Sequence, residues 1–285
     1  MKTLRALLRD RRFSLGAAIM SVLAVLALLS FLSPYDPTEW RVVPRDLPPS
    51  LEHFLGTSSL GQDVFWQLAA AIRNSILLAL LAASISRVIA LTLGLVAGYS
   101  GGPIDRVLMF INDGFLVLPL LLIFVLLAMI LREQLSLLTM ALLFGLMGWA
   151  FDARLIRSQI LSLREREFTY TAILSGNPAI RLIFNEYLLF VVPLAMATLI
   201  GNMIWVTGME VTLAYLGLTD VTIPTLGTML HYALNNQAIL LGLWWWIFAP
   251  IGAAIALFSS LYLLSVSVSE YLDPRARIQR VGGVR

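Results

Sequence analysis

Long apolar runs, most of them about the length needed to cross a lipid bilayer, dominate this sequence. An α-helix needs about 20 apolar residues to span the hydrocarbon core, and polar stretches separate the runs here. We therefore predict an all-α integral membrane protein with six transmembrane helices. The expected spans are residues 13–33, 74–99, 107–131, 136–151, 187–212 and 243–266, of which the fourth is the shortest.

The composition supports a membrane protein and excludes several kinds of site. The chain is 59% hydrophobic and 13% charged, whereas soluble domains are nearer half apolar and a quarter charged. Cysteine is absent, which excludes disulfides, iron–sulfur clusters and thiol chemistry. The two histidines, His53 and His231, lie far apart in sequence, so we predict neither a haem nor a metal site.

The positions of the basic residues predict the orientation of the chain. Of the 20 Lys and Arg residues, fifteen fall in segments that the six-span arrangement places on one side, and that side is expected to be the cytoplasm. Both termini are then cytoplasmic. The segment 34–73 lies outside, and residues 213–241 are expected outside as a short or re-entrant helix packed against protein.

The longest polar interruption in the second half of the chain is residues 152–190. We expect a helix over 163–174, then a Ser-Gly-Asn-Pro turn, then an amphipathic piece over 180–187. A helix–glycine–helix loop on the cytoplasmic side is a natural docking part for a soluble partner. The alternative is an ordinary solvated loop.

Two charged residues within or near the expected spans are candidates for a solute path. Arg87 lies near the middle of the second span, where a charge is costly in lipid, so it should face protein or water. It either lines the path or forms a structural pair, with Glu210 or with a partner subunit. Glu210, near the outer end of the fifth span, either faces the path or holds the outer loop.

Two further acids, Asp113 and Asp152, lie near the inner ends of the third and fourth spans. We expect them to cap helices or to pair with nearby arginines rather than to bind solute. The candidate partners are Arg106, Arg154 and Arg157.

The sequence argues against ATP hydrolysis by this chain itself. A Walker A loop needs a lysine after its glycine-rich turn, and the only lysine here is Lys2. If transport is driven by ATP, the hydrolysis and the bound ATP and magnesium belong to another chain, and no cofactor is expected in this one. We predict that the chain is not itself an enzyme.

Four stretches together carry a resemblance to a known family. They are LGTSSLGQDVFWQL (55–68), GYSGGPIDRVLMFINDGFLVLP (98–119), RLIRSQILSLREREFTYTA (154–172) followed by Gly176, and EVTLAYLGL (210–218). In this combination and order, the chain resembles the permease subunit of binding-protein-dependent ABC importers of the dipeptide, oligopeptide or nickel type. The resemblance implies an N-terminal anchor and outer segment over 1–54 and a permease core over 55–285.

The resemblance also implies a coupling loop at 152–186, with a short helix that fits a groove on an ATPase subunit. The family signature usually begins Glu-Ala-Ala; here Tyr170 and Thr171 replace its first two residues, whereas Ala172 and Gly176 fit. Leu189 stands where a proline is usual, and Pro193 follows. The predicted coupling residues are Arg164, Arg166, Glu167, Phe168, Tyr170, Ala172, Gly176 and Arg181.

The partners that the resemblance implies are a second homologous permease, two ATPase subunits, an extracytoplasmic solute-binding protein and the lipid membrane, with no nucleic acid. The location is a bacterial or archaeal cell membrane, the inner one if the cell is Gram-negative. Peptides are the default solute, oligosaccharides the main alternative, and nickel is also carried by related systems.

Two other classes of function fit the sequence less well than the importer. A stand-alone secondary transporter or channel often shows inverted repeats with broken helices, and the sequence shows no convincing internal repeat. A membrane enzyme would need paired carboxylates, a metal-ligand cluster or a nucleophile beside a base, and no such spacing stands out.

Overall fold

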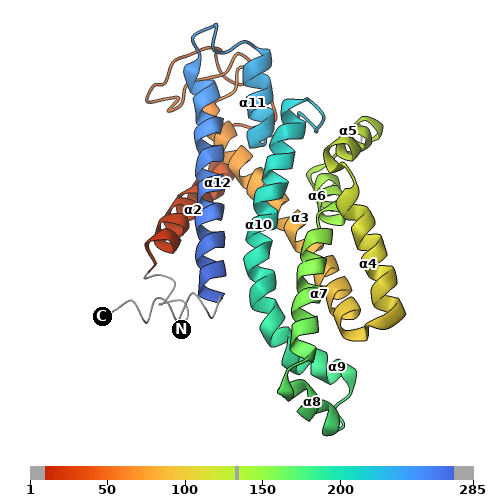
Figure 1. Ribbon diagram of the computed structural model, residues 1–285. Helices are drawn as coiled ribbons and strands as arrows, with labels where there is room; N and C mark the ends of the chain where they lie inside the picture. The colour runs from red at the N-terminus through yellow and green to blue at the C-terminus, as the bar shows by residue number, and fades with distance from the viewer. Residues whose placement is uncertain (1–9, 132–134, 273–285) are drawn as a thin grey trace.

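Helices make up the regular structure of the chain wherever it is described (Figure 1). The computed structural model describes residues 10–131 and 135–272, and in these ranges the other ordered pairing is one isolated bridge between Thr57 and Asp63. Four helices of the described residues are long and apolar enough to cross a membrane, or up to six spans if each of two bent pairs counts as one. The four are α2 (Arg11–Leu29, extended by the short η1, Ser30–Leu32), α3 (Val64–Ser100), α10 (Leu188–Tyr215) and α12 (Trp244–Leu272).

The third expected span is not one straight helix. It divides into α4 (Gly102–Val117) and α5 (Leu120–Ile130), which are bent by 80° with respect to each other. Pro119 stands between them and lacks a backbone N–H, and it keeps Leu118 in an extended conformation with ψ of 133°. The bend therefore has a local cause in the chain.

The fourth expected span is also bent, and it is longer than predicted. It divides into α6 (Leu137–Met147) and α7 (Ala150–Arg164), with a bend of 45°. α7 continues as helix to Arg164, past residue 152 where the loop is expected to begin, and that boundary stays a prediction. The helix expected over 163–174 is instead α8 (Glu167–Leu174), which follows a tight turn.

α3 is the helix around which the others pack, and it contacts α2, α6, α7 and α10. Its glycines let α7 approach closely. A Cβ built at Gly94 would lie 2.8 Å from the carbonyl oxygen of Ala153, and one at Gly98 would lie 2.7 Å from Cβ of Ile160. The backbones of α3 and α7 therefore approach so closely that only glycine fits at these two positions.

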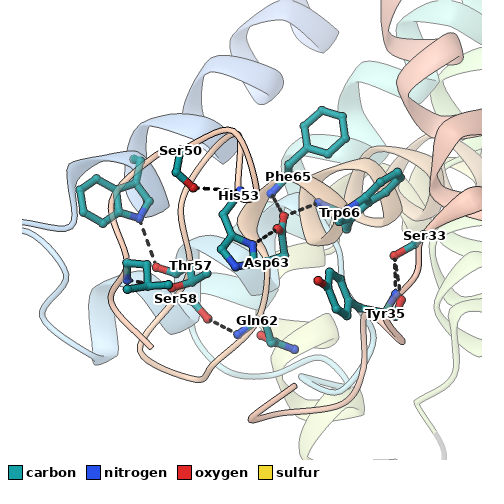
Figure 2. A network of polar contacts seen from close by, with 12 residues as sticks. Ser33, Tyr35, Ser50, His53, Thr57, Ser58, Gln62, Asp63, Phe65 and Trp66 are labelled. Atoms are coloured by element: carbon teal, nitrogen blue, oxygen red, sulfur yellow. Dashed lines mark hydrogen bonds and ion pairs between the residues drawn. The ribbon is translucent and has the colours of Figure 1, made fainter. Parts of the chain in front are cut away.

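α3 begins at Val64, well before the expected residue 74, because Asp63 caps it. The Asp63 carboxylate accepts hydrogen bonds from the backbone N–H groups of Phe65 and Trp66 and also contacts His53 Nδ1 at 2.7 Å (Figure 2). Nearby, Trp245 Nε1 of α12 donates to the Thr57 carbonyl at 3.2 Å. The segment before α3 is therefore packed against α12.

The helices place two separate structures at opposite ends of the molecule (Figure 1). One end carries α8, α9 (Ala179–Leu182) and a turn of π-helix over Ile183–Tyr187. The other carries the segment before α3 and the short α11 (Leu226–Asn235), which is the helix expected within 213–241.

An ion pair of 2.8 Å between Arg12 and Glu270 ties the start of α2 to the end of α12. The two ends of the described chain therefore lie together, as the prediction of termini on one side requires. The terminal residues themselves, including Lys2, lie outside the described ranges, and the side of the membrane on which they lie stays a prediction.

We predict that a single added methyl group at Gly94 destabilises the protein. Gly94→Ala should lower the free energy of unfolding by about 1–3 kcal/mol, because the methyl has no room beside α7. Gly114→Ala on α4 is the control, since a Cβ there meets no atom within 4 Å. Thermal unfolding of the purified chains in detergent measures both, and an equal melting temperature for the two variants would contradict the prediction.

Candidate functional site

A buried ion pair joins α3 to the first turn of α7. The Arg87 guanidinium lies 2.9 Å from the Asp152 carboxylate, and their side chains are only 5% and 7% exposed. Arg87 therefore pairs within this chain, but with Asp152 and not with Glu210. Asp152 likewise pairs with an arginine other than the three expected, because the close contact of α3 and α7 brings together residues far apart in sequence.

Two asparagines bond backbone carbonyls at the bend between α6 and α7. Asn202 of α10 donates to the Gly148 carbonyl at 3.0 Å, and Asn112 of α4 donates to the Ala150 carbonyl at 2.7 Å. The Gly148 carbonyl follows the last turn of α6, where a helix leaves carbonyls without intrahelical partners and lipid offers no hydrogen bonds to them. Neither asparagine was predicted from the sequence to have a role.

A cavity of about 470 Å³ lies where the two bent spans meet α10 and α12. One wall comes from the bends themselves and the other from the middle of α10 and the end of α12. Its lining residues are Phe115, Leu116, Leu120, Met147, Gly148, Ala150, Phe151, Asp152, Ala197, Thr198, Gly201, Asn202, Trp205, Ser265 and Ser269.

The cavity combines aromatic walls with a few polar groups. Its rings are those of Phe115, Phe151 and Trp205, and its polar groups are the Asp152 carboxylate, the Asn202 amide and three hydroxyl groups. This mixture is typical of sites for organic solutes. Among the described residues, no group of three or more His, Cys, Asp or Glu side chains is placed to hold a metal ion.

Glu210, the other candidate for the path, does not line this cavity. It is buried on α10, and its Oε1 accepts a hydrogen bond of 2.5 Å from the Thr225 hydroxyl. Thr225 is the N-cap of α11, where it forms a capping box with Thr228. In this structure, Glu210 therefore joins α10 to the start of α11.

The inner face of α8 packs against the end of α7. Thr169 and Ala172 are buried there, and the Thr169 hydroxyl donates to the Leu163 carbonyl at 2.8 Å. Phe168 stacks on Phe190 of α10 with ring centroids 5.7 Å apart. Two predicted coupling residues, Phe168 and Ala172, therefore attach α8 to the rest of the chain.

The outer face of α8 carries an apolar stripe. Tyr170, Ile173 and Leu174 are 57%, 54% and 88% exposed, and their spacing of i, i+3 and i+4 puts them on one side of the helix. Such a stripe is the form in which a short helix enters a groove on a partner. Ile173 and Leu174 were missed in the sequence analysis, although this spacing could have identified them.

Gly176 ends α8 in a Schellman motif. Its φ is +74°, its N–H bonds the Ile173 carbonyl, and the N–H of Asn177 bonds the Ala172 carbonyl at 3.1 Å. A Cβ at Gly176 would meet no atom within 4 Å, so the glycine is required by the backbone conformation and not by crowding.

The four predicted charged residues lie around α8. Arg164 donates to the Gly98 carbonyl of α3 at 3.2 Å, and the Arg166 guanidinium lies over the Phe190 ring at 5.9 Å. Glu167 and Arg181 are exposed. Glu167 and Arg181 are thus available to a partner, whereas Arg164 helps to hold α7 against α3.

Comparison with known proteins shows the family to which the chain belongs. Residues 90–278 match the family described as "Binding-protein-dependent transport system inner membrane component". The chain belongs to this family. It is 32% identical over 86% of its length to the dipeptide transport system permease protein DppC of Bacillus subtilis (strain 168), with 76% of that relative covered.

Two further relatives of the permease are named for other solutes. It is 29% identical to the oligopeptide transport system permease protein OppC of the same Bacillus strain, over 86% of the permease and 79% of the relative. It is 37% identical to the nickel transport system permease protein NikC of Escherichia coli (strain K12), over 67% of the permease and 68% of the relative.

Family membership confirms the resemblance and the coarse function. The permease is a multi-pass inner-membrane component of a transport system, and the family's members are membrane components of importers and not enzymes themselves. A binding-protein-dependent system implies an ATPase partner and a solute-binding protein.

We predict that breaking the buried ion pair from one side is costly. Asp152→Asn should destabilise the permease by about 3–5 kcal/mol, because it leaves the Arg87 charge buried without a counterion. The double variant Arg87→Met with Asp152→Asn should recover much of this loss. Thermal unfolding in detergent measures both variants. A double variant no more stable than Asp152→Asn alone would contradict this account of the pair.

Proposed function

We propose that this permease forms half of the solute pathway of an ATP-driven ABC importer and that α8 transmits the work of a separate ATPase. The observation that carries the proposal is the exposed stripe of Tyr170, Ile173 and Leu174 on a helix whose inner face is anchored. An apolar face of this kind, with Glu167 and Arg181 nearby, suits a groove on a soluble partner. The family gives that partner its expected identity.

The proposed cycle needs other subunits. A second homologous permease completes the pathway, and two ATPase subunits bind ATP and magnesium. ATP binding brings the ATPases together and carries α8 with them. The spans then change between inward-open and outward-open arrangements by rigid-body movement. A solute-binding protein delivers the solute on the outer side.

Peptides are the proposed solute class. Two of the relatives described above are named for dipeptides and oligopeptides, and the cavity offers aromatic surface beside hydroxyl, amide and carboxylate groups. The Arg87 charge compensates that of Asp152, so the wall carries no net charge from this pair. Oligosaccharide, the other solute expected from the sequence, stays a prediction.

We predict that charges on the α8 stripe release the ATPase. Ile173→Glu with Leu174→Glu should reduce the ATPase recovered with the tagged permease from gently solubilised membranes of its host by about tenfold or more, because two charges cannot enter an apolar groove without a large desolvation cost. Ile239→Glu with Leu240→Glu is the matched control, since this pair is equally apolar and exposed but lies between α11 and α12.

Wild type and control should retain the ATPase and the second permease. Equal recovery of the ATPase with the α8 variant would refute the assignment of the stripe. A wild-type chain that is recovered alone and that transports solute in liposomes by itself would refute the importer and favour a stand-alone transporter.

We also predict that the cavity belongs to the solute path. The sequence has no cysteine, so Gly201→Cys introduces a single thiol that faces the cavity, where a Cβ meets no atom within 4 Å. A charged thiol reagent should label it in the assembled importer, and a transported dipeptide should slow the labelling. Gly208→Cys, with equal space on the same helix but outside the cavity lining, should show no such protection. Protection at neither position would exclude the cavity from the path.

A further inference from the structure

α4 and α7 are joined by polar contacts along their length, which we call the α4–α7 clamp. Arg157 of α7 forms two bonds to the Asp105 carboxylate, at 2.5 and 2.6 Å. One turn further along, Arg154 pairs with Asp113, as the sequence analysis expected for this acid. Beyond it, Asn112 bonds the Ala150 carbonyl. The clamp consists of these six residues.

The pair of Asp105 and Arg157 is the principal contact of the clamp. It is bidentate, and the side chains are 16% and 27% exposed. Bidentate arginine–carboxylate pairs are stronger and more specific in geometry than single contacts. The pair of Asp113 and Arg154 is about half exposed and contributes less.

Along the chain, α8 is joined to α7 more directly than to α10. Between α7 and α8 there is only a tight turn, closed by the Thr169 bond to Leu163. Between α8 and the body of α10 lie the Gly176 turn, the π-helical turn over 183–187 and Pro193, which interrupts the hydrogen bonding inside α10. The chain therefore offers a direct route from α8 to α7, while Phe168 and Arg166 add side-chain contacts with Phe190 of α10.

The cavity lies between the clamped helices and the others. Phe115 and Leu116 near the end of α4 and residues 150–152 at the start of α7 form one side, together with Met147 and Gly148 at the end of α6. α10 and α12 form the other side. Because the clamp joins α4 to α7, both parts of the first side should move together when α8 moves.

We infer that Asp105 and Arg157 are positioning residues that make α4 move with the coupling helix, so that ATPase movement reshapes the cavity. This inference rests on the proposed function, since it needs α8 to be the ATPase contact. It predicts that the clamp determines how much solute is moved for each ATP, and not whether the ATPase binds.

Charge reversal tests the clamp in the complete importer, reconstituted in liposomes with its ATPase and binding protein and supplied with a dipeptide. Arg157→Asp should leave ATPase recovery unchanged and lower the peptide taken up per ATP hydrolysed about tenfold. Asp105→Arg with Arg157→Asp should restore at least part of that ratio. Arg12→Asp, which breaks an ion pair between α2 and α12, is the control and should keep the wild-type ratio.

The milder variant Asp105→Asn covers the case in which charge reversal prevents folding, and it should lower the ratio in the same direction. A distance between spin labels at Phe110 of α4 and Met196 of α10 gives a second measurement. ATP should change this distance in the otherwise wild-type importer and change it less when Arg157→Asp is added.

The outcomes separate the two proposals. A wild-type permease that recovers no ATPase would refute the proposed function, and the inference with it. A wild-type importer that works normally, with Arg157→Asp and Asp105→Asn keeping its ratio of uptake to ATP, would refute the clamp alone. The double variant Asp105→Arg with Arg157→Asp gives a further test. If it melts at the wild-type temperature but takes up no more peptide per ATP than Arg157→Asp alone, the clamp is also refuted.

Discussion

The close contact between α3 and α7 is the interaction on which the rest of the structure depends. In lipid, helices gain little from burying apolar surface against one another, and association relies on packing and interhelical polar contacts. Gly94 and Gly98 supply the packing by bringing the two backbones together. That approach places Arg87 beside Asp152 and lets Arg164 reach the Gly98 carbonyl. The position of α7, and through it of α8, follows from this contact.

Polar side chains within the spans lie where one segment must be attached to another. Arg87 and Asp152 join α3 to α7, Asn202 joins α10 to the bend before α7, and Glu210 joins α10 to the start of α11. Each is costly in lipid unless it has a partner. Because such contacts are directional, they specify how neighbouring helices are placed, whereas apolar packing alone tolerates sliding.

The sequence predicted the helical class, the approximate spans and the short helix now seen as α11, because apolar length and charge are local signals. It did not predict the partner of Arg87, since Asp152 is distant in the chain and only the packing of α3 on α7 brings the two together. Pro119 lies inside the third expected span, yet the 80° bend at this proline was not foreseen. On α8, the family signature pointed to Ala172. The exposed face, however, depends on the residue at which the helix begins and on its rotation about its axis. Ile173 and Leu174 were missed for this reason.

The bend between α6 and α7 has a consequence for how the permease tolerates change. Its carbonyls at Gly148 and Ala150 are bonded by amides that belong to α10 and α4. The angle of the bend is thus held by other helices, and not by the residues of the bent span alone. Evolution can retune the shape of this region through substitutions at either asparagine, leaving the bent span itself unaltered. Relatives with different solutes need not differ where the chain actually turns.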